Sequence, residues 1–591
     1  MLGHVPTTTL KEKAGKTFRI IKHKVTTREG LIGDYDYAFL FTPKIPFMKR
    51  KEDEPSTFFP LNSSLPLFLA ILLGFQHSLA MVAGVVTPPL IMGGSANFGP
   101  ELSQYLVSAC LIGSGILSLI HIIRFRIPKT NIFIGTGLIS VVGTSFATIN
   151  VFTSSLPIMY RSGICPTAAD GTPLPCPDGY GRLIATAMVC ALLEVLLSFL
   201  PARILKKVFP PIVTGPVVLL IGVELVSSGF KDWAGGSGPC FGRPTSGDFM
   251  MCPSNNAPMA APWGSAQFIG LGFLVFISIL CCEKWGAPIM KSCSVVIGLL
   301  VGCIVAAACG YFDRTNIDAA PVGTFLWTHT FKLKLYGPAV LPMLAVYLVL
   351  MMESIGDITA TCDVSRQAVE GPEYESRIKG GILGDGLIGI LAGAFTLTPM
   401  STFAQNNGVI ALTKCANRQA GAWACFFMLI MGIFAKFAAA IVAIPKPVLG
   451  GMTTFLFSSV CVSGIAIITR AGKIQRRERL ILTASLVMGL GATMVPNWFS
   501  FVFTYQGDNH SLRGFYDAIE LVMTNGFAIA GFVGIACNLI LSEEKSIDEE
   551  EEMQVVEIDA AEEENSSSDD MAHETKRASE DHKRVDRAEM V

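Results

Sequence analysis

The chain has few charged residues. Asp, Glu, Lys and Arg make up only 16% of its 591 residues, whereas an average soluble protein carries about 25%. Hydrophobic residues make up 51% of the chain, and the mean hydropathy is +0.51. This scarcity of charge excludes an ordinary soluble domain. The net charge of −2 is uninformative, because the charged residues are gathered in a few segments.

Motifs that mark common enzymes are also missing from the sequence. It contains no Walker-type phosphate loop, no paired-histidine zinc motif and no GxSxG elbow in a strand-to-helix setting. We therefore expect a protein that is not an enzyme, without a metal site or a cofactor. The start of the chain is polar and basic and lacks the apolar core of a cleavable signal peptide. The first spanning helix is therefore expected to direct membrane insertion.

The sequence is instead rich in long apolar runs. They recur along the chain with lengths of about 18 residues or more, enough to cross a bilayer core of about 30 Å. The pattern predicts an all-α polytopic membrane protein with about fourteen transmembrane segments. The expected spans are residues 65–92, 104–123, 131–152, 181–200, 208–229, 266–282, 289–310, 338–356, 380–397, 402–414, 419–443, 449–469, 479–495 and 517–541.

Lysine and arginine residues predict the orientation of these spans. They are concentrated in the N-terminal tail and in the loops that follow even-numbered spans, and such loops face the cytosol. Both tails, residues 1–64 and 542–591, are therefore expected to be cytosolic. The second tail is acidic and too polar to fold alone, so we expect it to be disordered. The "DYDY" element, Asp34 to Tyr37, is either a sorting signal or part of a merely solvated tail.

Four of the 16 cysteines lie outside the apolar runs, whereas most of the others lie within them and behave as small hydrophobic residues. Cys165 and Cys176 share one Pro/Gly-rich loop, and Cys240 and Cys252 share another. The predicted topology places both loops outside the cell, where disulfides persist. We expect the pairs Cys165–Cys176 and Cys240–Cys252, and cross-pairing between the two loops is the alternative.

An internal repeat links the third and tenth expected spans. The third contains "GTSFATIN" (Gly143–Asn150) and the tenth contains "STFAQNN" (Ser401–Asn407). The two copies lie seven spans apart, so they cross the membrane in opposite directions, as an inverted-topology repeat requires. Paired, interrupted segments of this kind point to a binding site near the middle of the membrane. The two repeats expected from this pattern are residues 65–310 and 338–541.

Three carboxylates lie in apolar surroundings. Glu353 and Asp357, in "MMESIGDITA", are four residues apart and share one face of a helix, and Asp385 lies in "GGILGDGLIGIL". An intramembrane carboxylate is a functional-site hypothesis by default. The alternatives are an interfacial or ion-paired role for Glu353 and Asp357, and a structural hydrogen bond for Asp385. We expect Glu353 to couple proton and substrate, with Asp357 and Asp385 as the next candidates.

Three consecutive amides, Gln405, Asn406 and Asn407, occur at membrane depth. A glutamine that faces Glu353 can bind a planar heterocycle with alternating N–H and C=O groups, and the ring of Phe146 can cover its face. Such a heterocycle is an oxopurine. The alternative is that the amides only join helices. His77 in "GFQHSLAM" and Phe527 in "TNGFAIAG" have a functional reading in proton transfer and gating, and a structural reading in hydrogen bonding and packing.

The segment "QNNGVIALTK", Gln405 to Lys414, resembles the signature Q/E/P-N-x-G-x-x-x-x-T-R/K/G of the nucleobase–ascorbate transporter family. It matches at Gln405, Asn406, Gly408, Thr413 and Lys414, and "QH" and "ESIGD" also look like motifs of the family. The resemblance covers roughly residues 65–541 and is strongest for the fungal branch that carries uric acid and xanthine. Lys414 stands where that branch prefers arginine, which could shift the substrate range.

The resemblance implies a fold and a set of site residues. The fold is a 7+7 inverted repeat in which a core domain (spans 1–4 and 8–11) moves against a gate domain (spans 5–7 and 12–14). The gate domain would form a homodimer. The implied substrate contacts are the side chains of Glu353 and Gln405 and the main chain of Phe146 and Ala404, with Ser145 beside them. The implied coupling residues are Asp357, Asp385, Asn406 and His77, and the implied selectivity or gating residues are Phe527, Thr413 and Lys414.

The function implied is proton-coupled import of xanthine and uric acid across the plasma membrane by an elevator-like motion. Protons serve as the coupling ion, membrane lipid surrounds the protein, and no nucleic acid partner is expected. The alternatives are the same fold with uracil, ascorbate or an anion as substrate, or a channel or non-transporting sensor. Glu353 argues against an anion at the site.

Overall fold

A computed structural model gives the fold of most of the apolar region. It describes residues 22, 24–33, 35, 37–43, 58–169, 173–200, 208–236, 240–241, 243–245, 250–252, 259–369, 371–403, 405–469, 472–495, 498–503 and 510–541. The acidic tail from residue 542, half of the "DYDY" element and Ala404 lie outside these residues, so the predictions for them remain predictions.

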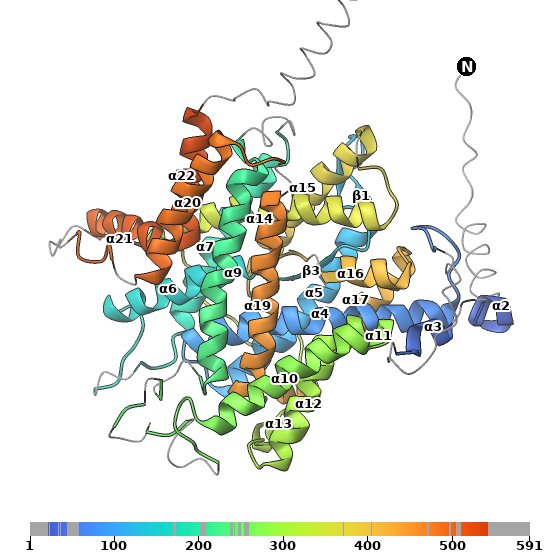
Figure 1. Cartoon of the computed structure of the whole chain (residues 1–591), viewed down its shortest axis with the longest axis horizontal. Helices are drawn as coiled ribbons and strands as arrows, with labels where there is room; N and C mark the ends of the chain where they lie inside the picture. The colour runs from blue at the N-terminus through green and yellow to red at the C-terminus, as the bar shows by residue number, and fades with distance from the viewer. Residues whose placement is uncertain are drawn as a thin grey trace, which may run out of the picture.

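Helices make up nearly all of the regular structure (Figure 1). The helices before the midpoint are α2 (Arg28–Leu31), α3 (Tyr37–Phe41), α4 (Leu67–Ser95), α5 (Pro100–Ile123), α6 (Ala147–Arg161), α7 (Pro177–Leu197), α9 (Pro211–Trp233), α10 (Ala266–Trp285), α11 (Pro288–Ser292) and α12 (Ser294–Ala308). Those after it are α13 (Thr315–Ala319), η1 (Gly337–Ala339), α14 (Val340–Val364), α15 (Pro372–Ala394), α16 (Gln405–Thr413), α17 (Arg418–Ile433), α18 (Ala435–Val442), α19 (Lys446–Thr469), α20 (Arg476–Met494), α21 (His510–Thr524) and α22 (Gly526–Ile540). The strands are β1 (Phe125–Arg126), β2 (Phe133–Ile134), β3 (Val141–Thr144) and β4 (Met400–Phe403).

Several of these helices are long and apolar enough to cross a membrane. Among the described residues there are seven, or nine if each of two bent helix pairs counts as one span. The pairs are α17–α18, bent by 77°, and α21–α22, bent by 89°. The expected spans at 419–443 and 517–541 each correspond to such a bent pair, because the chain turns at Phe434 and at Asn525. Apolar composition does not reveal such a turn.

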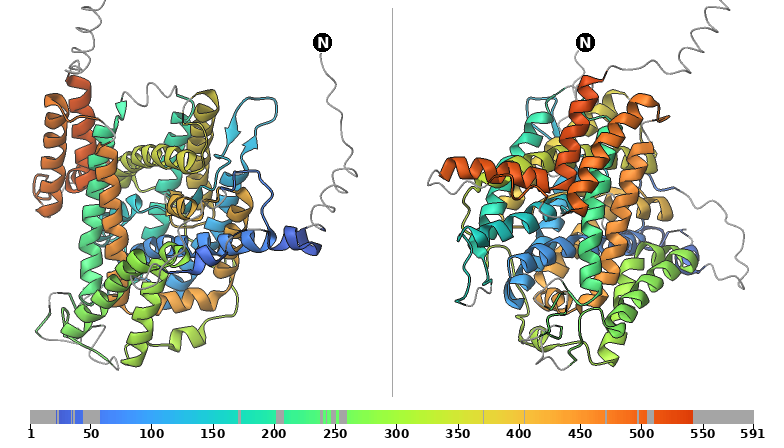
Figure 2. Two further views of the ribbon diagram at one scale, coloured as in Figure 1. Left: turned by 45° about the vertical axis from the view of Figure 1, so that its right-hand side comes forward. Right: turned by 60° about the vertical axis from the view of Figure 1, so that its left-hand side comes forward.

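The long helices pack in two groups. In the first, α9 and α19 lie side by side along their lengths, and α10, α12, α20 and α22 pack against this pair (Figures 1 and 2). Glycines allow the close approach: a Cβ at Gly464 would lie 2.4 Å from the Leu219 nitrogen, and one at Gly222 would lie 2.6 Å from the Cys461 nitrogen. The second group comprises α4, α5, α7, α14, α15 and α17.

Two strands at the centre join the halves of the chain. β3 pairs antiparallel with β4, from Val141 opposite Phe403 to Thr144 opposite Met400. Each strand leads into a short helix, β3 into α6 and β4 into α16. The third and tenth expected spans are thus interrupted, and their extended parts satisfy each other's backbone groups by hydrogen bonding. The helical part of the third segment begins later than expected and continues to Arg161.

Side chains of α5 and a backbone carbonyl of α4 hold β3 in place. The Val142 nitrogen donates a hydrogen bond to Oγ of Ser118 at 2.7 Å, and the Ser114 hydroxyl donates to the Val142 carbonyl. The hydroxyl of Thr144 donates to the Val85 carbonyl of α4 at 2.9 Å. The extended segment therefore has hydrogen-bonding partners on several sides, although it lies within an apolar bundle.

Two disulfides close the loops that the sequence singled out. Cys165 bonds to Cys176, and Cys240 bonds to Cys252, so each loop contains its own bridge. The first bridge lies against the start of α7, where a Cβ at Gly179 would come within 2.7 and 2.8 Å of its two sulfurs. Both pairings are those expected from the sequence.

Candidate functional site

A cavity of about 330 Å³ lies where the two packing groups meet. This volume is typical of a small-molecule site, for which about 300–1,000 Å³ is usual. One wall is built from the paired strands and the helices beside them, and the opposite wall comes from α19. The lining residues are Ser145, Phe146, Leu350, Glu353, Ser401, Thr402, Phe403, Gly408, Ser459, Val460 and Ser463.

Aromatic rings form one side of the cavity. The rings of Phe146 and Phe403, one from each interrupted segment, are stacked at 10° with their centroids 5.8 Å apart. Phe457 of α19 meets Phe146 edge to face. A Cβ at Gly143 would lie 2.5 Å from the Phe403 ring, so only glycine leaves room for this ring beside β3. The cavity thus offers an apolar, planar surface next to polar groups.

Glu353 supplies the carboxylate of the cavity. It projects from α14, which continues past Asp357 to Val364, so both acids lie on one unbroken helix, as expected. Glu353 lies close enough to Asp385 of α15 for the two charges to interact. Asp357 is half-buried and does not line the cavity, but its carbonyl lies 3.5 Å from the Asn407 amide nitrogen.

Asp385 connects β4 to the surrounding helices. Its Oδ1 accepts hydrogen bonds from the backbone nitrogen and the hydroxyl of Thr402, both at 2.9 Å. Its Oδ2 accepts from the hydroxyls of Ser354 at 2.5 Å and Ser401 at 2.8 Å. The aspartate is 2% exposed. It therefore fixes the strand that carries the cavity-lining residues, whether or not it also takes part in transport.

The signature segment forms α16 and its C-terminal end. Asn406 is buried and donates to the Ile139 carbonyl, and Asn407 accepts from the Thr361 hydroxyl at 2.6 Å. The Thr413 hydroxyl donates to the Val409 carbonyl within the helix. Lys414 ends the segment with φ 54°, and its carbonyl accepts from the Phe59 nitrogen. The structure places Gln405 at the start of the helix but does not describe its side chain.

His77 and Phe527 also lie outside the cavity lining. His77 is fully buried in α4, and neither ring nitrogen has a hydrogen-bond partner among the described residues. Phe527 is also fully buried and lines a separate apolar pocket between α9, α14 and α22. Their roles in coupling and gating remain predictions.

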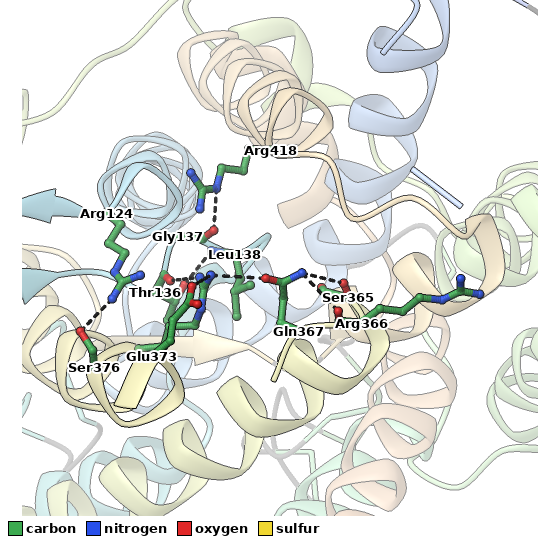
Figure 3. A network of polar contacts seen from close by, with 11 residues as sticks. Arg124, Thr136, Gly137, Leu138, Ser365, Arg366, Gln367, Glu373, Ser376 and Arg418 are labelled. Carbon is green, nitrogen blue, oxygen red and sulfur yellow. Dashed lines mark hydrogen bonds and ion pairs between the residues drawn. The ribbon is translucent and has the colours of Figure 1, made fainter. Parts of the chain in front are cut away.

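A cluster of arginines holds the loop before β3 (Figure 3). Arg377 of α15 donates to the Thr136 carbonyl at 3.0 Å. Arg418 of α17 donates to the Gly137 carbonyl at 2.6 Å (Figure 3). Arg124 at the end of α5 joins the cluster through α15. From the sequence, these arginines were interpreted only as markers of cytosolic loops. In the structure they also bind the loop that leads into β3.

Sequence reasoning missed other polar residues of the region. Ser459 and Ser463 line the cavity from α19, and serines four residues apart on one helix face were the available signal. Glu194 in "ALLEVLL" and Glu224 in "IGVELVSS" are carboxylates within apolar runs, the same signal that identified Glu353. The Glu224 carboxylate accepts from the Gly526 nitrogen at 3.1 Å, at the turn between α21 and α22.

Comparisons with known proteins find relatives over most of the chain. A family model described as "Permease family" matches residues 69–498. The chain is 61% identical over 536 residues to the purine permease of Emericella nidulans, covering 90% of this chain and 92% of that protein. It is 56% identical over 540 residues to the uric acid-xanthine permease of the same fungus, covering 91% and 92%. It is 32% identical over 491 residues to the xanthine permease XanQ of Escherichia coli K12, covering 82% and 93%.

A solved structure of the murine anion transporter Slc26a9, in its inward-facing state, is 11% identical to this chain, and the two structures compare with a TM-score of 0.47. The comparison covers 86% of this chain and 74% of the transporter. The family match and the three permeases carry the assignment. The signature at Gln405–Lys414 and the match over residues 69–498 agree. The chain is a multi-pass membrane protein that belongs to this permease family, the nucleobase–ascorbate transporters.

Proposed function

We propose that the chain imports xanthine and uric acid together with protons across the plasma membrane. The relatives named as purine and uric acid-xanthine permeases are 61% and 56% identical over about nine-tenths of the chain. The observation that carries the proposal is the cavity, in which the Glu353 carboxylate faces stacked aromatic rings between two interrupted segments. A flat heterocycle with polar edges fits such a surface.

The proposed binding mode follows from the groups that line the cavity. Glu353 accepts a hydrogen bond from a ring N–H, and the ring lies against Phe146. The helices α6 and α16 begin beside the cavity, so the positive ends of their dipoles favour the carbonyl oxygens of an oxopurine. Gln405 begins α16, where its amide would add a donor and an acceptor, and the main chain of Phe146 and Ala404 would complete the site.

The packing supports an elevator-like mechanism. In this proposal α4–α7 and α14–α18 would form the core domain, and α9–α12 and α19–α22 would form the gate domain, and the two packing groups support this division. The antiparallel pairing of β3 with β4 supports the 7+7 inverted repeat. Because the cavity lies between the two groups, sliding the core along α19 would carry a bound purine across the membrane. The gate domain would form the homodimer contact.

Protons would drive accumulation through the intramembrane acids, with Glu353 as the residue that meets both substrate and proton. Asp357, Asp385, Asn406 and His77 would support this coupling, and Phe527, Thr413 and Lys414 would tune selectivity. The expected orientation places both tails in the cytosol and the disulfide loops outside the cell. No cofactor is required besides the proton.

Uptake in cells that lack their own purine permeases tests the proposal. We expect cells expressing the chain to accumulate labelled xanthine against its gradient. Unlabelled uric acid should compete, whereas uracil and ascorbate should not. Accumulation should vanish when the proton gradient is collapsed. Competition by uracil or ascorbate would indicate the alternative substrates, equilibration without accumulation would indicate a channel, and no uptake by a chain that reaches the surface would indicate a sensor.

A further inference from the structure

A buried glutamate, Glu194, lies behind the cavity wall, next to Asp385, the residue that binds β4. Glu194 belongs to α7, is 1% exposed, and lies within an apolar run of that helix. It is outside the cavity lining and outside the family signature. A carboxyl group this deep in a membrane bundle is costly unless it has a partner or a function.

Glu194 lies next to Asp385. Helices α7 and α15 pack tightly here, since a Cβ at Gly386 would lie 2.8 Å from the Val195 nitrogen and 3.3 Å from the Ala191 carbonyl oxygen, and the two carboxyl groups are close enough to interact. Oε1 of Glu194 has no hydrogen-bond partner among the described residues.

Asp385 already accepts four hydrogen bonds, two on each oxygen, from Thr402, Ser354 and Ser401. Of these partners, the Thr402 N–H can only donate, whereas the three hydroxyls can donate or accept. The hydroxyls can therefore adapt to a proton on either carboxyl group of the pair.

One carboxyl group of the pair must carry a proton at this range. Two ionised carboxylates at hydrogen-bonding distance repel each other strongly where water is excluded, and such a pair keeps one proton between them. Because the Thr402 N–H always donates to Asp385, we place the proton at rest on Glu194. The pair thus holds one proton at membrane depth.

The groups around the pair leave room for this proton to move. Tyr347 of α14 is 1% exposed, lies close enough to interact with both acids, and its hydroxyl has no hydrogen-bond partner among the described residues. A Cβ at Gly389 would lie 3.1 Å from that hydroxyl, so the glycine makes space for it. The further titratable groups that face the pair are His121 of α5 and Glu353 of α14, both close to Asp385, and Cys190 on α7 itself.

We propose that Glu194 and Asp385 form a proton-binding site that holds the coupling proton beside the substrate cavity. The site connects to the cavity at two points. Asp385 anchors Ser401 and Thr402, which line the cavity, and it lies near Glu353. This proposal rests on the proton-coupled function proposed above.

The pair also gives a physical link between proton and substrate. Transfer across the contact breaks the O–H bond of Glu194 and forms one on Asp385, with no third reactant. A protonated Asp385 gains a donor and loses acceptor capacity, so it can no longer accept all four hydrogen bonds. The hydrogen bonds that join Asp385 to Ser401 and Thr402 of β4 would then weaken. The cavity wall that these two residues form would change with the position of the proton.

Substitution of Glu194 by glutamine tests the site. Glu194→Gln keeps the shape and an N–H donor toward Asp385 but cannot release a proton. We expect exchange of labelled for unlabelled xanthine to persist with a KM within about twofold of the unmodified chain. Proton-driven accumulation should fall to equilibration, and the dependence of uptake on external pH should flatten. Glu194→Asp keeps an ionisable group and should restore part of the accumulation.

The control is Glu101→Gln, which removes an exposed carboxylate whose side chain is 86% accessible and should change neither quantity. A Glu194→Gln chain that concentrates xanthine with the original pH dependence would overturn the proposal. If the unmodified chain itself transports purines without a proton gradient, the proposed coupling fails rather than the site.

Infrared spectroscopy of the purified, unmodified chain gives a test that needs no variant. A buried protonated carboxyl group has a C=O stretch separate from that of a carboxylate. We expect such a band at neutral pH, and we expect it to shift when xanthine is added. The absence of any protonated carboxyl band at neutral pH would show that the pair holds no proton and would overturn the proposal independently of transport.

Discussion

At the scale of single residues, the cavity depends on one charged side chain. Glu353 is the carboxylate among the described residues that line the cavity. In the proposed binding mode, a purine N–H that donates to it would form a charge-assisted hydrogen bond. Other polar residues of the lining are hydroxyl-bearing and cannot replace it. This makes Glu353 the most informative position for measuring substrate binding.

We predict that Glu353→Gln weakens xanthine binding while the protein still reaches the cell surface. The amide keeps the size of the side chain but loses the charge, and a hydrogen bond to a charged group contributes about 1.5–3 kcal/mol. The inhibition constant of xanthine should therefore rise about 10- to 100-fold. It is measured by competition uptake, with surface abundance as the control for folding. An unchanged constant would remove Glu353 from the binding site.

Sequence alone identified part of this chemistry. Glu353 and Asp385 stand out because a carboxylate in an apolar run is rare, and the structure brings them close together. Glu194 gives the same signal and was missed, because nothing in the sequence shows that α7 faces Asp385. Ser459 and Ser463 were missed for a similar reason: serine is common in membrane helices, and only the fold shows which serines face a cavity.

At the scale of elements, the paired strands form the wall of the cavity. The fit of Phe403 against β3 requires Gly143, because any Cβ there would meet three atoms of the ring at 2.5–2.8 Å. The ring itself is confined by its stack on Phe146 and by Gly84 of α4. The wall has little freedom to absorb an added methyl group.

We predict that Gly143→Ala displaces the Phe403 ring and lowers both purine uptake and stability. Overpacking of this kind costs about 1–3 kcal/mol. Uptake of labelled xanthine and the thermal unfolding midpoint of the detergent-purified chain should both fall. Gly491→Ala on α20 is the matched control, because a Cβ there meets nothing within 4 Å. Equal behaviour of the two variants would show that the ring can move without consequence.

The repeat in the sequence indicated which segments are interrupted but not what replaces the helix. Two short patterns, around Phe146 and Phe403, pointed to the third and tenth segments. The hydrogen-bonded strand pair depends on residues from both halves of the chain and has no local signature. The turns at Phe434 and Asn525 were missed because both lie within apolar runs, and hydropathy measures composition rather than direction.

At the scale of the whole molecule, the expected orientation can be tested through the disulfide loops. In intact cells, we predict that an impermeant reductant followed by an impermeant maleimide labels the four cysteines of the two bridges. Cys303, in α12, should stay unlabelled because the reagent does not enter the lipid. Labelling is read by mass spectrometry of the isolated chain. Labelling that requires permeabilised cells would reverse the orientation.

The pairing of β3 with β4 also has a consequence for synthesis of the protein. The partners of residues 141–144 are residues 400–403, so the first strand leaves the ribosome long before the second exists. At about 5–20 residues per second, the delay is on the order of tens of seconds. During that interval an unpaired strand edge lies in the bilayer and must be shielded by the insertion machinery. In a chain that ends before residue 400, β3 never finds its partner strand. We therefore expect such a truncated chain to be degraded.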